Sequence, residues 1–258
     1  MQANDLALLT DAVRGAGKVA QRFAGSALRT WDKPGGAGPV TEADIKVNDY
    51  LKTVLRDARP DYGWLSEETE DSAERLSRDT VYIVDPIDGT RSFMAGSATW
   101  AHSVAVVHRG EVVAGAVFLP MRDLFYTAER GGGARLNDVP LRVSGTDQIE
   151  GANVLASKPI EEPRHWPDGV PGFTRSYRPS LAYRLGLVGQ GRFDAMLTFR
   201  PTWEWDIAAG ALIVEEAHGR CSDREGAPLR FNNATPTVDG MIAANAGLHR
   251  SFLSALGH

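Results

Sequence analysis

Two carboxylates that could share a metal ion follow a strand-like segment of this sequence. The apolar run Val81–Val84 ends at Asp85, and a short turn then brings Asp88, Gly89 and Thr90. Like charges this close raise each other's pKa and destabilise a fold unless a cation lies between them. Oxygen ligands suit Mg²⁺, and the Gly89 and Thr90 N–H groups offer a place for an anion. The stretch predicts a metal-assisted phosphate site; a polar β-turn with an Asp-Gly signal is the alternative.

Further acids lie at the ends of other predicted elements. Glu67 and Glu68 follow the short strand 64–66, so neighbouring strands both end in acids, which favours a metal site over a solvated rim. Asp44 is the third residue of a predicted helix and fits a capping box, which explains it without a function. Asp206 begins a helix of small residues. It fits a capping or first-turn acid and a ligand equally well.

The elements that must position these acids change in character along the chain. The first part predicts helices over 5–24 and 41–57 and an antiparallel meander over 102–128. Later residues alternate between predicted strands and predicted helices. The predicted strands are 153–156, 193–197 and 240–244, and the predicted helices are 180–189, 206–217 and 248–256. We therefore expect two lobes that share a cleft, an N-terminal one over 1–148 and a C-terminal one over 149–258.

Three glycine- or proline-rich segments predict irregular backbone. Residues 31–39 predict a mobile loop, and 158–175, with little periodicity, predicts a long surface segment. Gly131-Gly132-Gly133 lacks the spacing of a nucleotide-binding loop, so we expect a turn there.

Composition limits the classes of function. The chain has 258 residues, one cysteine (Cys221) and a formal net charge of −5. A single cysteine provides no disulfide framework or thiolate metal cluster and fits a reducing compartment. The sequence has no basic block typical of proteins that bind a nucleic-acid polymer, no signal-peptide pattern and no membrane-spanning run. We expect a cytoplasmic protein without integral membrane association.

Four segments together resemble the inositol monophosphatase superfamily of Mg²⁺-dependent, lithium-sensitive phosphomonoesterases. They are Val40-Thr41-Glu42-Ala43-Asp44, Ser66-Glu67-Glu68, Asp85-Pro86-Ile87-Asp88-Gly89-Thr90 and Trp205-Asp206-Ile207-Ala208-Ala209-Gly210. Their order and spacing match the family over nearly the whole chain. The resemblance implies an α/β (α+β) fold, a layered α/β/α/β/α sandwich, and a small phosphorylated substrate. Members of the family are often dimers, so a homodimer is expected.

The resemblance also implies two or three Mg²⁺ ions and their ligands. Glu67, Asp85 and the Ile87 carbonyl hold the first ion, and Asp85, Asp88 and Asp206 hold the second. A third, weaker ion is associated with Glu67. Metal-bound water loses its proton near neutral pH, and paired ions stabilise the attacking and leaving oxygens.

The catalytic and substrate contacts follow from the same resemblance. Thr90 and Asp44, with Glu67, orient and deprotonate the attacking water, while the Gly89-Thr90 backbone holds the phosphate. Arg91 is either a phosphate contact or a surface charge. The substrate contacts are expected at Asp88, Gly89, Thr90, Arg91, Arg184, Arg200 and Asp206.

Some details are similar to the 3'(2'),5'-bisphosphate nucleotidases of sulfur assimilation. The subfamily has a motif similar to Pro201-Thr202-Trp203-Glu204-Trp205-Asp206 of this chain. Residues 195–200 contain no glutamate, whereas a glutamate there would repel a second phosphate. Arg184 and Arg200 could neutralise a 5'-phosphate, with solvent-exposed arginines as the alternative. Two departures are the position of Arg200, displaced by two residues from the subfamily's positive charge, and the loss of a Gly-Ser-Ser run around 180–184.

The resulting hypothesis is hydrolysis of 3'-phosphoadenosine 5'-phosphate to AMP and phosphate. The alternatives in the same class are inositol monophosphatase and histidinol-phosphatase. An inactive ligand-binding homologue is the alternative from another class. It is disfavoured because every metal-ligand residue type is present.

Overall fold

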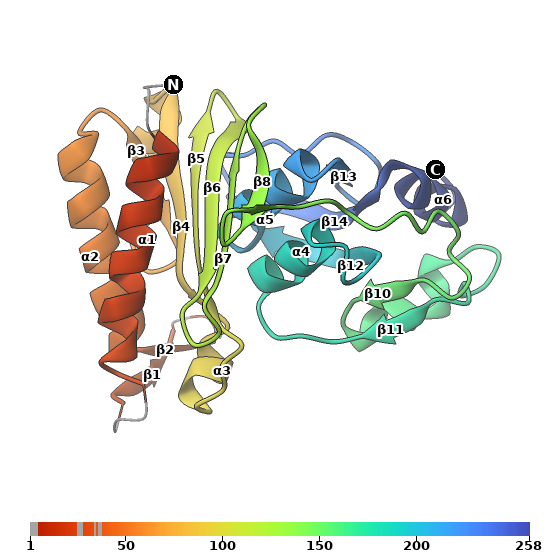
Figure 1. Cartoon of the computed structure of the whole chain (residues 1–258), viewed down its shortest axis with the longest axis horizontal. Coiled ribbons are helices and arrows are strands. Elements are labelled where there is room, and N and C mark those ends of the chain that lie inside the picture. Colours follow the sequence, from red (N-terminus) through yellow and green to blue (C-terminus); the bar gives the residue numbers. More distant parts are fainter. Residues whose placement is uncertain (1–4, 25–27, 34, 36–37) are drawn as a thin grey trace.

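The protein is a stack of alternating helical and sheet layers (Figure 1). Its computed structural model describes residues 5–24, 28–33, 35 and 38–258. In order, the layers are a helix pair, a seven-stranded sheet, a second helix pair, a five-stranded sheet and a final helix. The predicted α/β/α/β/α sandwich is confirmed.

The larger sheet carries most of the predicted ligands. Its strands follow sequence order, with β3 and β4 parallel and every other neighbouring pair antiparallel. The predicted meander is therefore confirmed, and two short strands extend it. The strands are β3 (Gly63–Ser66), β4 (Thr80–Asp88), β5 (Ala101–His108), β6 (Glu111–Leu119), β7 (Leu124–Glu129), β8 (Gly133–Leu136) and β9 (Val139–Pro140).

The smaller sheet is mixed, in the order β11-β10-β12-β14-β13. Its strands are β10 (Asn153–Leu155), β11 (Thr174–Ser176), β12 (Ala195–Trp203), β13 (Gly219–Ser222) and β14 (Thr237–Asn245). The strand predicted over 193–197 is longer than expected, because β12 continues through an irregularity between Thr198 and Pro201 and leads directly into the next helix. A bulge lets an antiparallel strand accept a proline without losing its pairing.

Helices cover both faces of the larger sheet and the outer face of the smaller one. They are α1 (Asp5–Gln21), α2 (Glu42–Ala58), α3 (Thr90–Met94), α4 (Leu181–Gly189), α5 (Glu204–Glu216) and α6 (Ala246–Ala255). α1 and α2 pack on one face of the larger sheet, α4 and α5 lie between the sheets, and α6 packs on β14. Three apolar cores lie between the layers, and the one around α4 and α5 extends to both sheets.

Two segments expected to be irregular are partly ordered. The ends of 31–39 form a hairpin of β1 (Thr30–Asp32) and β2 (Pro39–Thr41), so the loop prediction is wrong for them. The surface prediction for 158–175 is wrong for Ile160 and Trp166, which are buried and packed in the α6 core. Their isolated positions among prolines produce no periodic signal.

Of the remaining sequence predictions, one is confirmed, one stays untested and one falls partly outside the described residues. The predicted turn is confirmed at Gly131 and Gly132, while Gly133 begins β8, and the Gly131 and Gly133 N–H groups donate to the Glu216 carboxylate. The lobe boundary at 148/149 stays a prediction. Residues 34, 36 and 37 of the segment predicted to be a mobile loop lie outside the described residues. Among the described helices, none is long and apolar enough to span a membrane.

Candidate metal and phosphate site

The site begins where two parallel strands end at the same edge of the larger sheet. Ser66 of β3 pairs with Val84 of β4, so the next residues, Glu67 and Asp85, are neighbours. The Glu67 N–H donates to the Val84 carbonyl at 3.2 Å, which extends the ladder to the acids themselves. The expected meeting of acids from neighbouring strands is present.

Three carboxylates complete a cluster across the layers. Asp85, Asp88 and Asp206 each offer an oxygen within 4.8 Å of the others. Asp206 lies in the first turn of α5, whose N-cap is Trp203, so the first-turn alternative holds and the N-cap alternative is wrong. The Ser103 hydroxyl of β5 donates to the Trp205 carbonyl at 3.0 Å and ties this helix end to the sheet.

The electrostatics of the cluster are unfavourable without a cation. Burial, followed by the charges of Glu67 and Asp88, raises the pKa of Asp85 well above its ordinary value. Burial and the Asp88 charge do the same to the pKa of Asp206. Asp85 is 1% exposed, and its Oδ1 has no hydrogen-bond donor among the described residues. A buried acceptor of this kind is costly and indicates a missing positive partner.

A second pair of predicted residues lies beside the cluster. The Thr90 hydroxyl lies 3.2 Å from Asp44 Oδ1 and 3.2 Å from the Ile87 carbonyl oxygen. Asp44 is fully buried, and its other oxygen accepts from the N–H and hydroxyl of Thr41, so the predicted capping box is confirmed. Burial is the main reason why the pKa of Asp44 is raised. One carboxylate thus caps α2 and also contacts Thr90.

Asp88 points toward the second helical layer. Its Oδ2 accepts from the Ser180 hydroxyl at 2.7 Å and from the Ala182 N–H at 2.7 Å, at the start of α4. Burial raises the pKa of Asp88 to about 6, against the effect of these two hydrogen bonds. Ser180 is the N-cap of α4, as predicted, but its bond to Asp88 is not a local feature and could not be predicted.

The three predicted arginines occupy different environments. Arg184 is 6% exposed, so the alternative of a solvent-exposed arginine is wrong there; it lies over the Tyr177 ring at 4.5 Å, and its charge acts on Asp88. Arg200 is exposed, and its charge lowers the pKa of Asp206 against the larger effect of burial. Arg91 is exposed on α3. Gly89 adopts a left-handed conformation at φ 102° and begins α3, so it can turn the chain after Asp88.

Sequence reasoning missed one charged residue at the site. Lys33 lies 2.6 Å from both Glu67 Oε1 and Glu68 Oε1, although its segment was expected to be an irregular loop. Burial is the largest influence on Glu68, whose pKa is raised to about 7. No spacing signal links a lysine in a glycine-rich loop to two glutamates 34 and 35 positions later.

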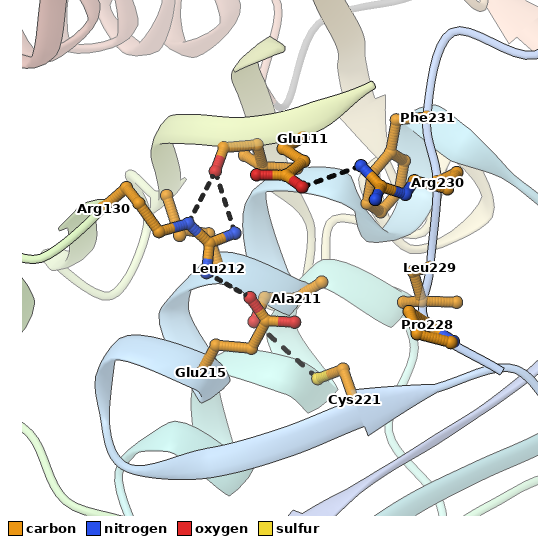
Figure 2. A pocket seen from close by; sticks show the side chains of 11 residues that line it. Glu111, Arg130, Ala211, Leu212, Glu215, Cys221, Pro228, Leu229, Arg230 and Phe231 are labelled. Carbon is orange, nitrogen blue, oxygen red and sulfur yellow. Dashed lines mark hydrogen bonds and ion pairs between the residues drawn. The ribbon is translucent and has the colours of Figure 1, made fainter. Parts of the chain in front are cut away.

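A separate hollow lies at the other end of α5 (Figure 2). Its acids are already paired: Glu215 with Arg130 at 2.6 Å and Glu111 with Arg230 at 2.7 Å. Cys221 lines it as a free, buried thiol. No predicted site residue lines this hollow.

Comparisons with known proteins place the chain. The model of the inositol monophosphatase family matches residues 1–257. The chain belongs to this family. It is 40% identical over 207 residues to an inositol-1-monophosphatase of Rhizobium meliloti, covering 74% of each chain. It is 34% identical to the Nus factor SuhB of Pseudomonas aeruginosa, over 72% of this chain and 73% of the relative. Over 98% of its length it is 29% identical to a histidinol-phosphatase of Chlorobaculum parvum, covering 97% of that protein.

Solved structures of family members agree with the fold. SuhB of Bartonella henselae has a TM-score of 0.83 and 32% identity, with 97% of each chain covered. An inositol monophosphatase of Thermotoga maritima has a TM-score of 0.82 and 28% identity, covering 100% of this chain and 97% of that one. This chain is therefore a Mg²⁺-dependent phosphatase of the inositol monophosphatase family. The finer subfamily assignment stays a prediction, because these relatives carry other names.

Proposed function

We propose that this phosphatase hydrolyses inositol monophosphate. The carrying observation is the similarity to inositol-1-monophosphatases, at 40% identity for the Rhizobium meliloti protein and 35% for that of Mesorhizobium japonicum. These names support the alternative weighed from the sequence better than the nucleotidase hypothesis. The cluster of Asp85, Asp88 and Asp206 supports metal-dependent chemistry but does not discriminate between leaving groups.

The residues present fit Mg²⁺. The carboxylates of the cluster and the unpartnered Asp85 Oδ1 form an oxygen-only donor set, which this ion prefers. In the proposal, Glu67, Asp85 and the Ile87 carbonyl hold one ion, and Asp85, Asp88 and Asp206 hold a second. When bound, the ions supply water acidification and charge neutralisation at the phosphate.

The remaining roles belong to side chains around the cluster. The Thr90 hydroxyl donates its hydrogen to Asp44, so the lone pairs of the Thr90 hydroxyl can accept a hydrogen bond from a water. Asp44, with a raised pKa caused by burial, can take up the proton that this water releases. The Gly89 and Thr90 N–H groups are proposed to hold the phosphate. Glu67 contributes to orienting the water from the neighbouring strand.

A second candidate substrate is 3'-phosphoadenosine 5'-phosphate. Two observations favour it: Arg184 and Arg200 exert their charge at Asp88 and Asp206, and residues 195–200 contain no carboxylate. Two cations whose charge acts on the metal-ligand residues favour a substrate that carries a second anionic group. An exposed Arg91 is a further proposed phosphate contact. A cytoplasmic location, lithium sensitivity and a homodimer stay predictions.

Phosphate release from three substrates tests the assignment. The full chain is assayed with Mg²⁺ against inositol monophosphate, 3'-phosphoadenosine 5'-phosphate and histidinol phosphate, with and without Li⁺. We expect the highest kcat/KM for inositol monophosphate and loss of activity in Asp88→Asn. A higher kcat/KM for the nucleotide would establish the second candidate, and no hydrolysis of any of them contradicts both.

A further inference from the structure

Ser180 is held in a backbone conformation that serine rarely adopts. Its φ is 66° and its ψ 113°, in the region that favours glycine. A side chain kept in such a conformation carries backbone strain, and strain of this kind occurs where surrounding contacts require it. Ser180 is also 7% exposed, so contact with solvent does not explain why a serine occupies this position.

The Ser180 hydroxyl joins two elements that are distant in sequence. It donates to Asp88 Oδ2 at 2.7 Å and accepts from the Tyr183 N–H at 3.0 Å. The first bond spans 92 positions and connects the end of β4 to the start of α4. The same hydroxyl is therefore both the cap of a helix and a donor to a carboxylate of the acid cluster.

The Asp88 carboxylate is bound at one oxygen. The Ala182 N–H adds a second donor to Oδ2 at 2.7 Å. Among the described residues, both hydrogen bonds to this side chain end on Oδ2. Two donors in fixed directions hold the plane of the carboxylate, which leaves Oδ1 for a partner from the cluster.

We propose that Ser180 is a positioning residue that sets the orientation of Asp88 toward the metal. The proposal rests on the metal-dependent hydrolysis proposed above. Groups that hydrogen-bond a ligating carboxylate orient it, and their loss typically weakens metal affinity about 10- to 100-fold. A glycine at position 180 would fit the backbone better but would lack the O–H group. The role of serine at this strained position is therefore to supply the hydroxyl.

Ser180→Gly and Ser180→Ala separate positioning from folding. Both variants remove the O–H donor, but glycine also relieves the strain, so Ser180→Gly is expected to be the more stable of the two. Mn²⁺ is the probe, and its affinity for the purified full chain is measured by electron paramagnetic resonance. We expect both variants to bind Mn²⁺ at least about 10-fold more weakly than the wild type. For inositol monophosphate at saturating metal, we expect a lower kcat and less than a twofold change in KM. Ser72→Ala removes a cap hydroxyl from the 3₁₀ helix Ala73–Ser77 and is the control, with unchanged Mn²⁺ affinity.

The outcomes separate this proposal from the proposed function. Wild-type Mn²⁺ affinity in both folded variants overturns the positioning role, whatever the substrate is. Weaker Mn²⁺ binding in a protein that hydrolyses none of the three substrates supports the positioning role and contradicts the proposed function. A wild-type protein that binds no Mn²⁺ contradicts both.

Discussion

The two ends of α5 carry acids in opposite electrostatic situations. At its start, Asp206 lies with Asp85 and Asp88, and burial together with neighbouring carboxylate charges raises the pKa of Asp85 and of Asp206. Near its end, Glu215 is paired with Arg130 at 2.6 Å, beside the hollow of Figure 2. The comparison teaches that a hollow does not by itself mark the reacting site. Buried acids do where no ion pair among the described residues neutralises them, because their charge requires a partner from solution.

The largest effect is expected from removing one charge at the start of α5. Asp85→Asn should lower phosphate release at least about 100-fold, the scale seen when a preorganised electrostatic contact is lost. In EDTA the same change should raise the free energy of unfolding by about 1–3 kcal/mol, because an uncompensated buried charge is removed. Activity assays and thermal unfolding measure the two effects. Asp79→Asn, at an exposed residue directly before the same strand, is the control. A destabilised Asp85→Asn would favour a structural role for Asp85 over a metal-binding role.

The next effect concerns pH and metal together. The folded-state pKa of Asp88 is raised to about 6, and those of Asp85 and Asp206 are raised further above their ordinary values. These three groups therefore hold more protons in the folded protein than in the unfolded chain, and in EDTA their contribution to stability should fall as pH rises from about 4 through 6 and beyond. Mg²⁺ at 100 times its Kd should restore about 2.7 kcal/mol near pH 7. Unfolding curves of the wild type and of Asp85→Asn at several pH values, with EDTA or Mg²⁺, isolate this contribution. A wild-type-minus-variant difference in stability that rises with pH in EDTA contradicts it.

A smaller effect distinguishes the two arginines on the substrate side. If the nucleotide is a substrate, Arg200→Ala should lower its kcat/KM about 10-fold, the value of one charge-assisted hydrogen bond, and change that for inositol monophosphate less than threefold. Arg200 is exposed, so the unfolding temperature of Arg200→Ala should stay unchanged. Arg184→Ala should also lower the unfolding temperature, because it removes a buried side chain that packs on the Tyr177 ring. Substrate assays and thermal unfolding check both. Equal losses for the two substrates contradict a role in binding a second anion.

The smallest effect is expected at the far end of α5. Glu215→Gln breaks an ion pair whose side chains are 30% and 42% exposed. Pairs this accessible contribute about 0–1 kcal/mol, and phosphate release should change less than twofold. Urea unfolding and activity assays measure this. A large loss of activity would show that this end of the helix also takes part in the reaction.

Local signals explain which parts of the site could be predicted. Thr41 and Asp44 form a capping box with a characteristic spacing, and the strands that lead to Glu67 and Asp85 are recognisable from apolar runs. Parallel pairing then brings the two acids to one edge. The order of side chains along the chain therefore determined the acids and the helices, and the resemblance to the inositol monophosphatase family implied the layered fold.

Tertiary structure alone decided how those acids are held. Ser180 reaches Asp88 across 92 positions and Lys33 reaches Glu67 across 34, while the burial of Arg184 depends on Tyr177 and the neighbouring layers. Such contacts depend on the packing of two sheets around α4 and α5, and no periodicity or local spacing records that packing. The sequence by itself determined which oxygen ligands exist; only the folded layers decided which of them meet and which form no ion pair among the described residues.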